Sequence, residues 1–206
     1  IVQDLTETGA SVSVARQVET LGVVIDLLIN NAGFGDYGPF VESVLDRQTS
    51  MIQLNISALV ELTHVFLRTM LERRQGGIIN VSSIAGFQPM PYWSVYAASK
   101  AFVLSFSEAL WAEVKEKGVN VLALCPGPTE SNFFNAAEAP SNIEMNSNLN
   151  QLDSVENVVT SALAALESGE SNTVTGGLMT QVIANLPRVL PRDVLVDLVE
   201  KQFRNA

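Results

Sequence analysis

Three short apolar segments constrain the fold of this 206-residue chain more than any other feature. They cover residues 23–30 (VVIDLLIN), 77–82 (GIINVS) and 119–124 (VNVLAL), and Gly, Asn or Pro residues bound them. Each segment is too short for a typical helix, rich in β-branched residues and apolar on both faces. That pattern is typical of strands buried inside a parallel sheet. We therefore predict three parallel strands.

Longer segments with helical periodicity separate and flank these strands. The predicted helices cover residues 4–21, 44–74, 96–117, 153–167 and 192–203. The first of them follows the expected end of a strand at residues 1–3. Because strands and helices alternate, the chain should form right-handed crossovers with helices on both faces of the sheet. The predicted fold class is therefore α/β, with a doubly wound parallel sheet.

Composition excludes several classes of function. The net charge of −10 argues against a nucleic-acid partner, because no basic phosphate-binding face is evident. No run of about 18 apolar residues predicts a membrane-spanning helix. The single cysteine, Cys125, cannot form an internal disulfide and suits a reducing compartment, so we expect a cytoplasmic protein. No cluster of His, Cys, Asp and Glu has the spacing of a metal site.

Tyr96 and Lys100 are the strongest candidate catalytic pair. Their spacing of four residues in a helical segment places them on one face, one turn apart. A nearby ammonium group favours the phenolate and should lower the pKa of Tyr96 from its usual value of about 10. Such a pair could exchange a proton with a carbonyl or an alkoxide. Alone, however, the pair is weak evidence, since Tyr and Lys often occur at this spacing by chance.

Polar or turn-forming residues also follow all three predicted strands. Residues 30–33 (NNAG), 82–83 (SS) and 125–129 (CPGPT) stand where carboxyl ends of parallel strands border a ligand crevice. Asn55 lies in the middle of a predicted helix, which is unfavourable unless its amide has a specific partner. Simple turn chemistry at Asn30 and Asn31 and a helix kink at Asn55 are the alternatives. The motifs together favour a ligand site.

This combination of motifs resembles the short-chain dehydrogenase/reductase family in its non-extended form. The matching elements, in the family's order and spacing over residues 1 to about 168, are NNAG (30–33), Asn55, Ser83, Tyr96-x-x-x-Lys100 and Pro126-Gly127-x-Thr129. The resemblance implies a Rossmann-like fold and reversible carbonyl/alcohol oxidoreduction with NADP or NAD. NADP is the preferred expectation, because the reductases that the chain resembles often use it.

The resemblance also implies roles for individual residues. Tyr96 would be the general acid in reduction and the base in oxidation, and Lys100 would lower its pKa and bind the nicotinamide ribose. Ser83, rather than Ser82, would hold the substrate oxygen, and Asn55 would anchor a water that links Lys100 to solvent. The implied cofactor contacts, besides Tyr96 and Lys100, are Asp4, Leu5, Asn30, Ala32, Gly33, Pro126, Gly127 and Thr129.

Substrate and partner expectations are coarser. About half of the group Phe87, Met90, Tyr92 and Trp93 should line an apolar substrate pocket, with Phe87, Tyr92 and Trp93 as the chosen candidates. Residues 133–134 (FF) are either a lid contact or an ordinary anchor. The substrate should be a small carbonyl or alcohol compound, apolar in character. A homodimer or homotetramer is implied, with the helices of Asn55 and Tyr96 at the interface.

The family's glycine-rich phosphate loop is not found in the sequence, which opens at Ile1. We therefore expect residues 1–206 to be one N-terminally incomplete dinucleotide-binding domain, with a substrate loop at about 129–152. A protein that senses the cofactor without turnover is the alternative, and the intact Ser83, Tyr96 and Lys100 argue against it. An extended-family epimerase or dehydratase also uses Y-x-x-x-K, but the NNAG motif and short C-terminal region argue against that class.

Residues 33–38 (GFGDYG) spell the G-x-G-x-x-G dinucleotide fingerprint in another context. A pyrophosphate loop opens directly into a helix, whereas Pro39 follows this one and Asp36 adds negative charge. We predict that these glycines instead turn the chain toward the helix of Asn55, along the substrate entrance. His64 is expected to be a packing or surface residue, and Cys125 a small core residue.

Overall fold

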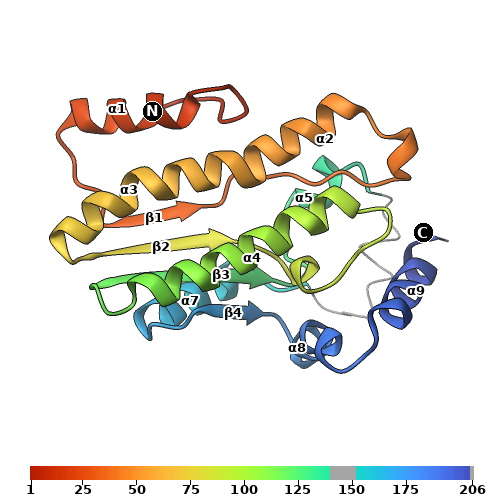
Figure 1. Ribbon diagram of the computed structural model, residues 1–206. Helices are drawn as coiled ribbons and strands as arrows, with labels where there is room; N and C mark the ends of the chain where they lie inside the picture. The colour runs from red at the N-terminus through yellow and green to blue at the C-terminus, as the bar shows by residue number, and fades with distance from the viewer. Residues whose placement is uncertain (140–151, 205–206) are drawn as a thin grey trace.

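Four parallel strands form one sheet in the computed structural model, which describes residues 1–139 and 152–204 (Figure 1). In their order across the sheet they are β1 Leu27–Asn30, β2 Gly76–Val81, β3 Val119–Pro126 and β4 Asn172–Thr175. All three neighbouring pairs are parallel. The three predicted strands are confirmed. The fourth was missed because its sequence, NTVT, is short and three of its four residues are polar.

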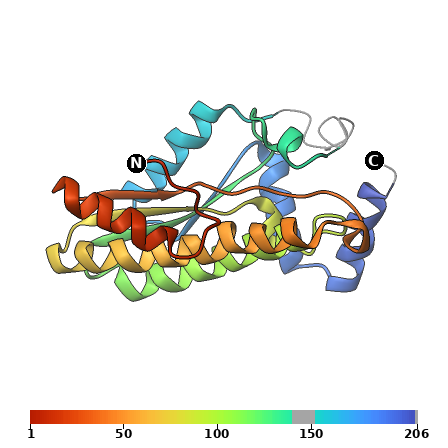
Figure 2. The same ribbon diagram turned by 90° about the horizontal axis from the view of Figure 1, so that it is seen from above.

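Helices cover both faces of this sheet. They are α1 Ala10–Leu21, α2 Leu45–Ile52, α3 Leu59–Arg73, α4 Ser94–Val114, α5 Phe133–Ala136, α7 Val155–Glu167, α8 Leu178–Asn185 and α9 Arg192–Phe203. Seen from above, α1, α3 and α4 lie on one side of the sheet and α7 on the other (Figure 2). The predicted doubly wound α/β architecture is therefore confirmed. The main core packs α3 and α4 on the sheet through Leu62, Phe66, Leu67, Met70, Ile78, Val114, Val119 and Val121.

Two elements near the N-terminus are shorter than predicted. The strand at 23–30 is reduced to β1, and residues 1–3 are not a strand. Helix α1 begins at Ala10 because Gly9 adopts a left-handed conformation with φ of 81°. Before it, the Asp4 carboxylate accepts hydrogen bonds from the backbone N–H and the hydroxyl of Thr6, at 2.8 and 2.6 Å. This local turn competes with the helix.

One continuous helix carries α2, α3 and the π-helical turn Gln53–Ala58 between them. Among the helices of the described ranges, this 29-residue segment, Leu45–Arg73, has the length and apolar composition to cross a membrane. In the fold it packs against α1, α4, β1 and β2. Its buried polar residues Gln48, Asn55 and Thr63 bind other segments of the chain. Packing as a core helix accounts for its apolar character.

A buried chain of hydrogen bonds fastens the strand ends to this helical layer. The Asn30 amide donates to Thr63 Oγ1 at 2.9 Å and to Asn80 Oδ1 at 2.8 Å. The Asn80 amide in turn donates to Ser107 Oγ at 3.0 Å, and Asn80 is fully buried. The network joins β1, β2, α3 and α4, and it aligns the strand ends that border the site.

We expect Asn80→Ala to lower the free energy of unfolding by about 3 kcal/mol. The substitution removes one hydrogen-bond partner from the buried Asn30 amide and one from the Ser107 hydroxyl. Denaturant unfolding followed by circular dichroism measures this change. Asn185→Ala is the matched control, since Asn185 donates only to the Gln181 carbonyl on an exposed helix surface. Equal effects of the two substitutions would contradict a structural role for the network.

Candidate active site

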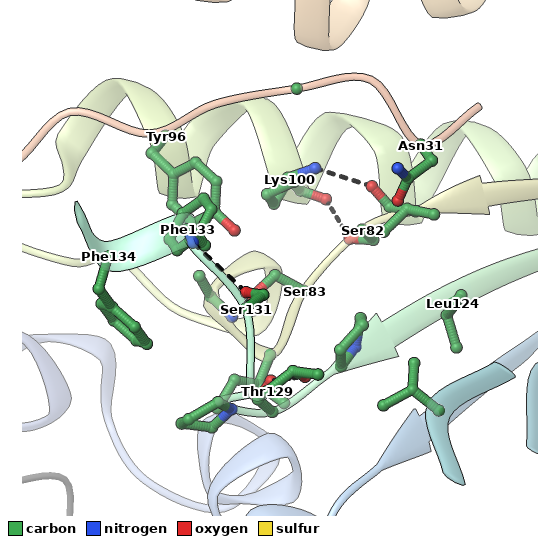
Figure 3. Close-up of a pocket in the computed structure, with 18 of the residues that line it drawn as sticks. Asn31, Ser82, Ser83, Tyr96, Lys100, Leu124, Thr129, Ser131, Phe133 and Phe134 are labelled. Carbon is green, nitrogen blue, oxygen red and sulfur yellow. Dashed lines mark hydrogen bonds between the residues drawn. The ribbon is translucent and has the colours of Figure 1, made fainter. Parts of the chain in front are cut away.

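A cavity of about 850 Å³ lies at the carboxyl ends of the strands (Figure 3). Ligands of open α/β sheets bind at this edge. Its polar lining includes Asn31, Ser82, Ser83, Tyr96, Lys100 and Thr129. Its larger apolar lining includes Ile29, Ile79, Val81, Leu124, Val155, Val158, Val159, Ala162 and Leu163. The cavity is thus large and mainly apolar, with few polar groups, as small-molecule sites commonly are.

Tyr96 and Lys100 reach the cavity from the first turns of α4. Their spacing places both on the same face of the helix, as predicted, and both are buried. Lys100 Nζ donates to the carbonyl oxygen of Val81 at 2.8 Å and lies 5.7 Å from the centre of the Tyr96 ring. The end of β2 therefore holds the ammonium group. Figure 3 shows Lys100 and Asn31 on one side of Tyr96 and Phe134 on the other, with Phe133 next to the Tyr96 ring.

The pKa of Tyr96 differs from the sequence-based expectation. Burial raises it to about 12, and the contact with the Ser83 hydroxyl offsets only part of this rise. Burial also lowers the pKa of Lys100 to about 8, although the neighbouring Cys125 acts in the opposite direction. The net shift of the Tyr96 pKa is therefore opposite to the lowering expected from the sequence, and the contribution of Lys100 to it stays a prediction. The physical reason is that Lys100 Nζ is bound to the Val81 carbonyl, while desolvation dominates at Tyr96.

The two serines after β2 have different partners. The Ser82 hydroxyl donates to the backbone carbonyl of Lys100 at 2.7 Å and is buried. The Ser83 hydroxyl oxygen accepts a bond from the Ala85 N–H at 3.1 Å and contacts Tyr96. Since Ser82 is already engaged with the helix backbone, Ser83 is the serine placed to meet a ligand beside Tyr96. This placement agrees with the choice made from the sequence.

Asn55 lies in the π-helical turn and does not line the cavity. Its amide donates to the Phe34 carbonyl at 2.9 Å and to Ser99 Oγ at 3.1 Å, and its oxygen accepts the Phe34 N–H at 3.2 Å. A Cβ atom on Gly33 would lie 2.8 Å from the Asn55 oxygen and 3.7 Å from Lys100 Nζ. Asn55 thus fixes the loop after β1 close to Lys100. Its expected water-mediated role stays a prediction.

The cofactor contacts expected from the sequence divide into two groups. Gly33, Pro126, Gly127 and Thr129 line the cavity, whereas Asp4, Leu5, Asn30 and Ala32 do not. The Asn30 side chain points into the buried network, and Asp4 is exposed in a local turn. Asn31 lines the cavity; the sequence placed it in the NNAG segment beside the expected ligand crevice but did not include it among the individual cofactor contacts. The alternation of side-chain direction along the strand could have identified it, because Asn30 and Asn31 face opposite ways.

These residues suit a nicotinamide dinucleotide, which the sequence resemblance implies. Lys100 supplies a cation for an anionic ligand, and Asn31 and Thr129 supply hydrogen-bonding groups along the cavity. A Cβ atom on Gly127 would lie 2.9 Å from Thr180 Cγ2, so only glycine lets the chain pass here without displacing that side chain. Gly33, Asn31, Lys100, Gly127 and Thr129 are therefore the groups that would hold the cofactor. The apolar lining would accommodate its rings.

Aromatic residues form the other end of the cavity. Of the candidates from the sequence, Met90 and Trp93 line it, and Phe87 and Tyr92 do not. Phe87 packs beside Leu104 and Cys125 on the core, while the Tyr92 hydroxyl is 3.4 Å from a Glu200 carboxylate oxygen on α9. Lining residues that the sequence did not suggest include Phe34 and Phe203, together with the apolar face of α7.

Phe133 and Phe134 are part of this aromatic wall. The Phe133 ring centre lies 5.1 Å from that of Tyr96 and 6.0 Å from that of Trp93, on which it stacks. The two phenylalanines are therefore cavity-wall residues. The rest of the expected substrate loop, residues 140–151, lies outside the described residues.

Two further residues behave as the sequence indicated. Cys125 is fully buried, and burial raises its thiol pKa to about 12, so it is a core residue. His64 is exposed on the surface of α3.

Comparison with known proteins agrees with this geometry. The sequence pattern of the short chain dehydrogenase family matches residues 1–142. The ketoacyl reductase HetN of Nostoc sp. (strain PCC 7120) is 36% identical over 124 residues, which are 60% of this chain and 43% of HetN. A dehydrogenase/reductase SDR family member 7B from Rattus norvegicus is 34% identical over 130 residues. The chain spans about two fifths of the length of these curated relatives, 43% and 40% respectively.

Solved structures extend the similarity. A short-chain dehydrogenase from Sphingobium yanoikuyae, in complex with NADPH, superposes with a TM-score of 0.74 at 30% identity, over 84% of this chain and 65% of that protein. The bulky-bulky ketone specific alcohol dehydrogenase from Comamonas testosteroni gives a TM-score of 0.70 at 26% identity, over 93% of this chain and 74% of that one. Sheet, cavity and sequence pattern lead to one conclusion: the chain belongs to the short-chain dehydrogenase family.

Proposed function

We propose that the protein is an NAD(P)-dependent oxidoreductase that interconverts a carbonyl and an alcohol. One observation carries this proposal: Tyr96, Lys100 and Ser83 meet on the wall of a large apolar cavity at the carboxyl edge of the sheet. A protein that only senses the cofactor has no need of a tyrosine hydroxyl, a serine hydroxyl and an ammonium group at one point. Family membership supports the same reaction class.

Ser83, Tyr96 and Lys100 have separate roles in proton transfer. The Ser83 hydroxyl, beside Tyr96, holds the substrate oxygen by a hydrogen bond. The Tyr96 hydroxyl gives its proton to that oxygen during reduction and takes it back during oxidation. Lys100, anchored on the Val81 carbonyl, places a positive charge that stabilises the developing phenolate. A nicotinamide dinucleotide, when bound, supplies or accepts the hydride.

We propose a ketone with a bulky apolar body as the substrate and NADP as the preferred cofactor. The wall near Tyr96 supports the first point, because Met90, Trp93, Phe133 and Phe134 offer aromatic and apolar surface there. The similar protein from Comamonas testosteroni is specific for bulky-bulky ketones, and the one from Sphingobium yanoikuyae is in complex with NADPH.

The test is a panel of ketones that differ only in the size of their apolar groups, assayed with NADPH and with NADH. We expect a bulky ketone to be reduced with a kcat/KM at least about tenfold above that of acetone, because added buried methylene groups strengthen binding. The nicotinamide absorbance measures the rate. If every ketone left the absorbance unchanged with both cofactors, the proposed function would be wrong.

We propose further that the protein works in the cytoplasm as a homodimer or homotetramer. Exposed apolar residues on the outer helices support the assembly: Ile52 and Phe102 are each more than two fifths exposed, and Phe102 stacks on Phe106 at 5.8 Å. Sedimentation of the purified protein distinguishes a monomer from these assemblies.

A further inference from the structure

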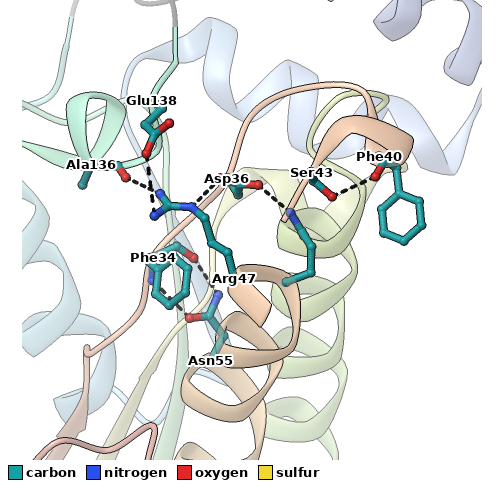
Figure 4. A network of polar contacts seen from close by, with 9 residues as sticks. Phe34, Asp36, Phe40, Ser43, Arg47, Asn55, Ala136 and Glu138 are labelled. Carbon is teal, nitrogen blue, oxygen red and sulfur yellow. Dashed lines mark hydrogen bonds and ion pairs between the residues drawn. The ribbon is translucent and has the colours of Figure 1, made fainter. Parts of the chain in front are cut away.

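Arg47 joins the loop after β1 to the short helix α5 (Figure 4). From α2, its Nε donates to an Asp36 carboxylate oxygen, and its Nη2 donates to the Ala136 carbonyl at 2.7 Å. Its Nη1 is 3.8 Å from a Glu138 carboxylate oxygen. One guanidinium group therefore connects residues 33–38 and α2 with the end of α5, which is 89 residues away in the sequence.

The surroundings of Arg47 fix the direction of its donors. The second Asp36 oxygen accepts a bond from the Gln48 amide, and Gln48 is buried. The Arg47 guanidinium carbon lies 5.4 Å from the centre of the Phe34 ring. A planar guanidinium held by a carboxylate and by an aromatic ring loses little further freedom when it binds another acceptor. The contacts with Asp36 and Phe34 thus orient the guanidinium of Arg47 toward α5.

Helix α5 depends on such contacts for its position. It has four residues, Phe133–Ala136, and a single turn is not stable by itself. Its last carbonyls are satisfied from outside, by Arg47 at Ala136 and by the Tyr37 N–H at Ala137, at 3.1 Å. A cation at a helix C-terminus is also electrostatically favourable. Arg47 and the 33–38 loop therefore hold the end of α5.

The position of α5 sets the wall of the cavity beside Tyr96. Phe133, its first residue, lies against Tyr96 and Trp93. The loop packs directly on this ring, since a Cβ atom on Gly35 would be 2.8 Å from Phe133 Cζ and 3.0 Å from Trp93 Cζ3. A side chain at position 35 would displace the wall. Gly35 thus permits a close contact between this loop and α5.

We infer that Arg47 is a positioning residue for the substrate: paired with Asp36, it fastens α5 so that Phe133 forms the wall of the cavity beside Tyr96. Arg47 itself does not line the cavity and acts only through α5. The consequence for substrate binding rests on the proposed function, whereas the fastening of α5 does not. The inference gives residues 33–38 a role in shaping the substrate end of the site.

The first test measures hydrogen exchange of the amides in residues 133–139. Arg47→Met keeps most of the side-chain volume but removes the charge and every donor. We expect exchange in this segment to become about tenfold faster, because a charge-assisted hydrogen bond that held the turn is lost. Arg73→Met is a matched control. Arg73 also binds a carboxylate and a carbonyl, Asp26 and Ile25, with similar exposure, 31% against 32%, far from α5.

The second test measures kinetics with a bulky apolar ketone. For Arg47→Met we expect KM to rise about tenfold while kcat stays within about twofold, since binding is weakened and the proton-transfer groups are untouched. Arg73→Met should change neither. Exchange that is equal in the two variants, or a KM unchanged in Arg47→Met, would overturn the inference. A parent protein without turnover would contradict the proposed function alone, because the exchange comparison still decides whether Arg47 holds α5.

Discussion

Tyr96→Phe is expected to lower kcat at least about 1,000-fold, because it removes the hydroxyl that gives the proton to a substrate oxygen held by Ser83. The aromatic ring is kept, so its packing against Trp93 and Phe133 is retained. The lost hydroxyl contacts Ser83 within the cavity. The free energy of unfolding should therefore change by less than about 1 kcal/mol. Steady-state kinetics and denaturant unfolding on the same preparation measure both quantities.

Tyr92→Phe is the control for this substitution. It removes a hydroxyl four residues away in the chain that lies outside the cavity, 3.4 Å from Glu200. Its turnover should stay within about twofold of the parent protein, since this hydroxyl makes one long contact outside the cavity. If Tyr96→Phe retained comparable turnover, the assignment of Tyr96 as the proton donor would be wrong.

Lys100→Met is expected to lower kcat/KM about 100-fold and to weaken dinucleotide binding. It removes the one cation among the residues that line the cavity in the described part of the chain, along with its bond to Val81. The ligand phosphates are anionic, and the phenolate that forms at Tyr96 is anionic too. Lys100→Met therefore removes the positive charge that stabilises the bound phosphates and the phenolate. Calorimetric titration with NADPH separates the binding effect from the effect on turnover.

The pH dependence gives a sharper signature of Lys100. Burial lowers its pKa to about 8, so the ammonium loses its proton as the pH rises from about 7 to about 9. Because the protonated form attracts an anionic ligand, the dissociation constant of NADPH should rise about tenfold over this range. We expect Lys100→Met to lose this pH dependence of NADPH binding. Lys115→Met, which changes an exposed lysine just beyond the end of α4, should keep it. The same slope in all three proteins would contradict the role of Lys100.

The sequence identified the elements whose patterns are strong and missed those whose patterns are weak. β2 and β3 are buried on both faces, so their apolar runs predicted them within two residues at each end. Helix α9 was predicted with its observed limits, 192–203. In contrast, β4 forms by pairing with β3 at residues 123–126, a contact between distant segments that leaves little local pattern. The start of α1 was misplaced because Gly9 and a local turn override helical periodicity.

The candidate site was predicted in part for similar reasons. The spacing of Tyr96 and Lys100 is a local property of one helix, and it placed them correctly. The direction of the Tyr96 pKa was not local, because it depends on how deeply the tertiary fold buries the ring. The α7 residues and Phe203 could not be assigned to the cavity wall from the sequence either. Helical periodicity identifies the apolar face of a helix but not the element that this face packs against. Asn30 could not be placed for the same reason: its polar side chain hydrogen-bonds inside the core rather than lining the cavity.

The GFGDYG segment illustrates how context decides the meaning of a motif. Its spelling is that of a phosphate loop, but the chain continues into Pro39 and the short turn Phe40–Glu42. Its acidic residue, Asp36, pairs with Arg47 and Gln48. The segment packs against Phe133 beside the cavity, and its expected place along the substrate entrance stays a prediction.

The most direct test of the proposed function follows the hydride itself. A bulky ketone is incubated with the protein and NADPH that carries deuterium at both positions of the reactive nicotinamide carbon, and the product is analysed by mass spectrometry. We predict an alcohol with one deuterium on its carbinol carbon, while the hydroxyl proton comes from Tyr96 and exchanges with water. An alcohol without deuterium on that carbon, or no alcohol at all, would contradict the proposal that this chain catalyses hydride transfer.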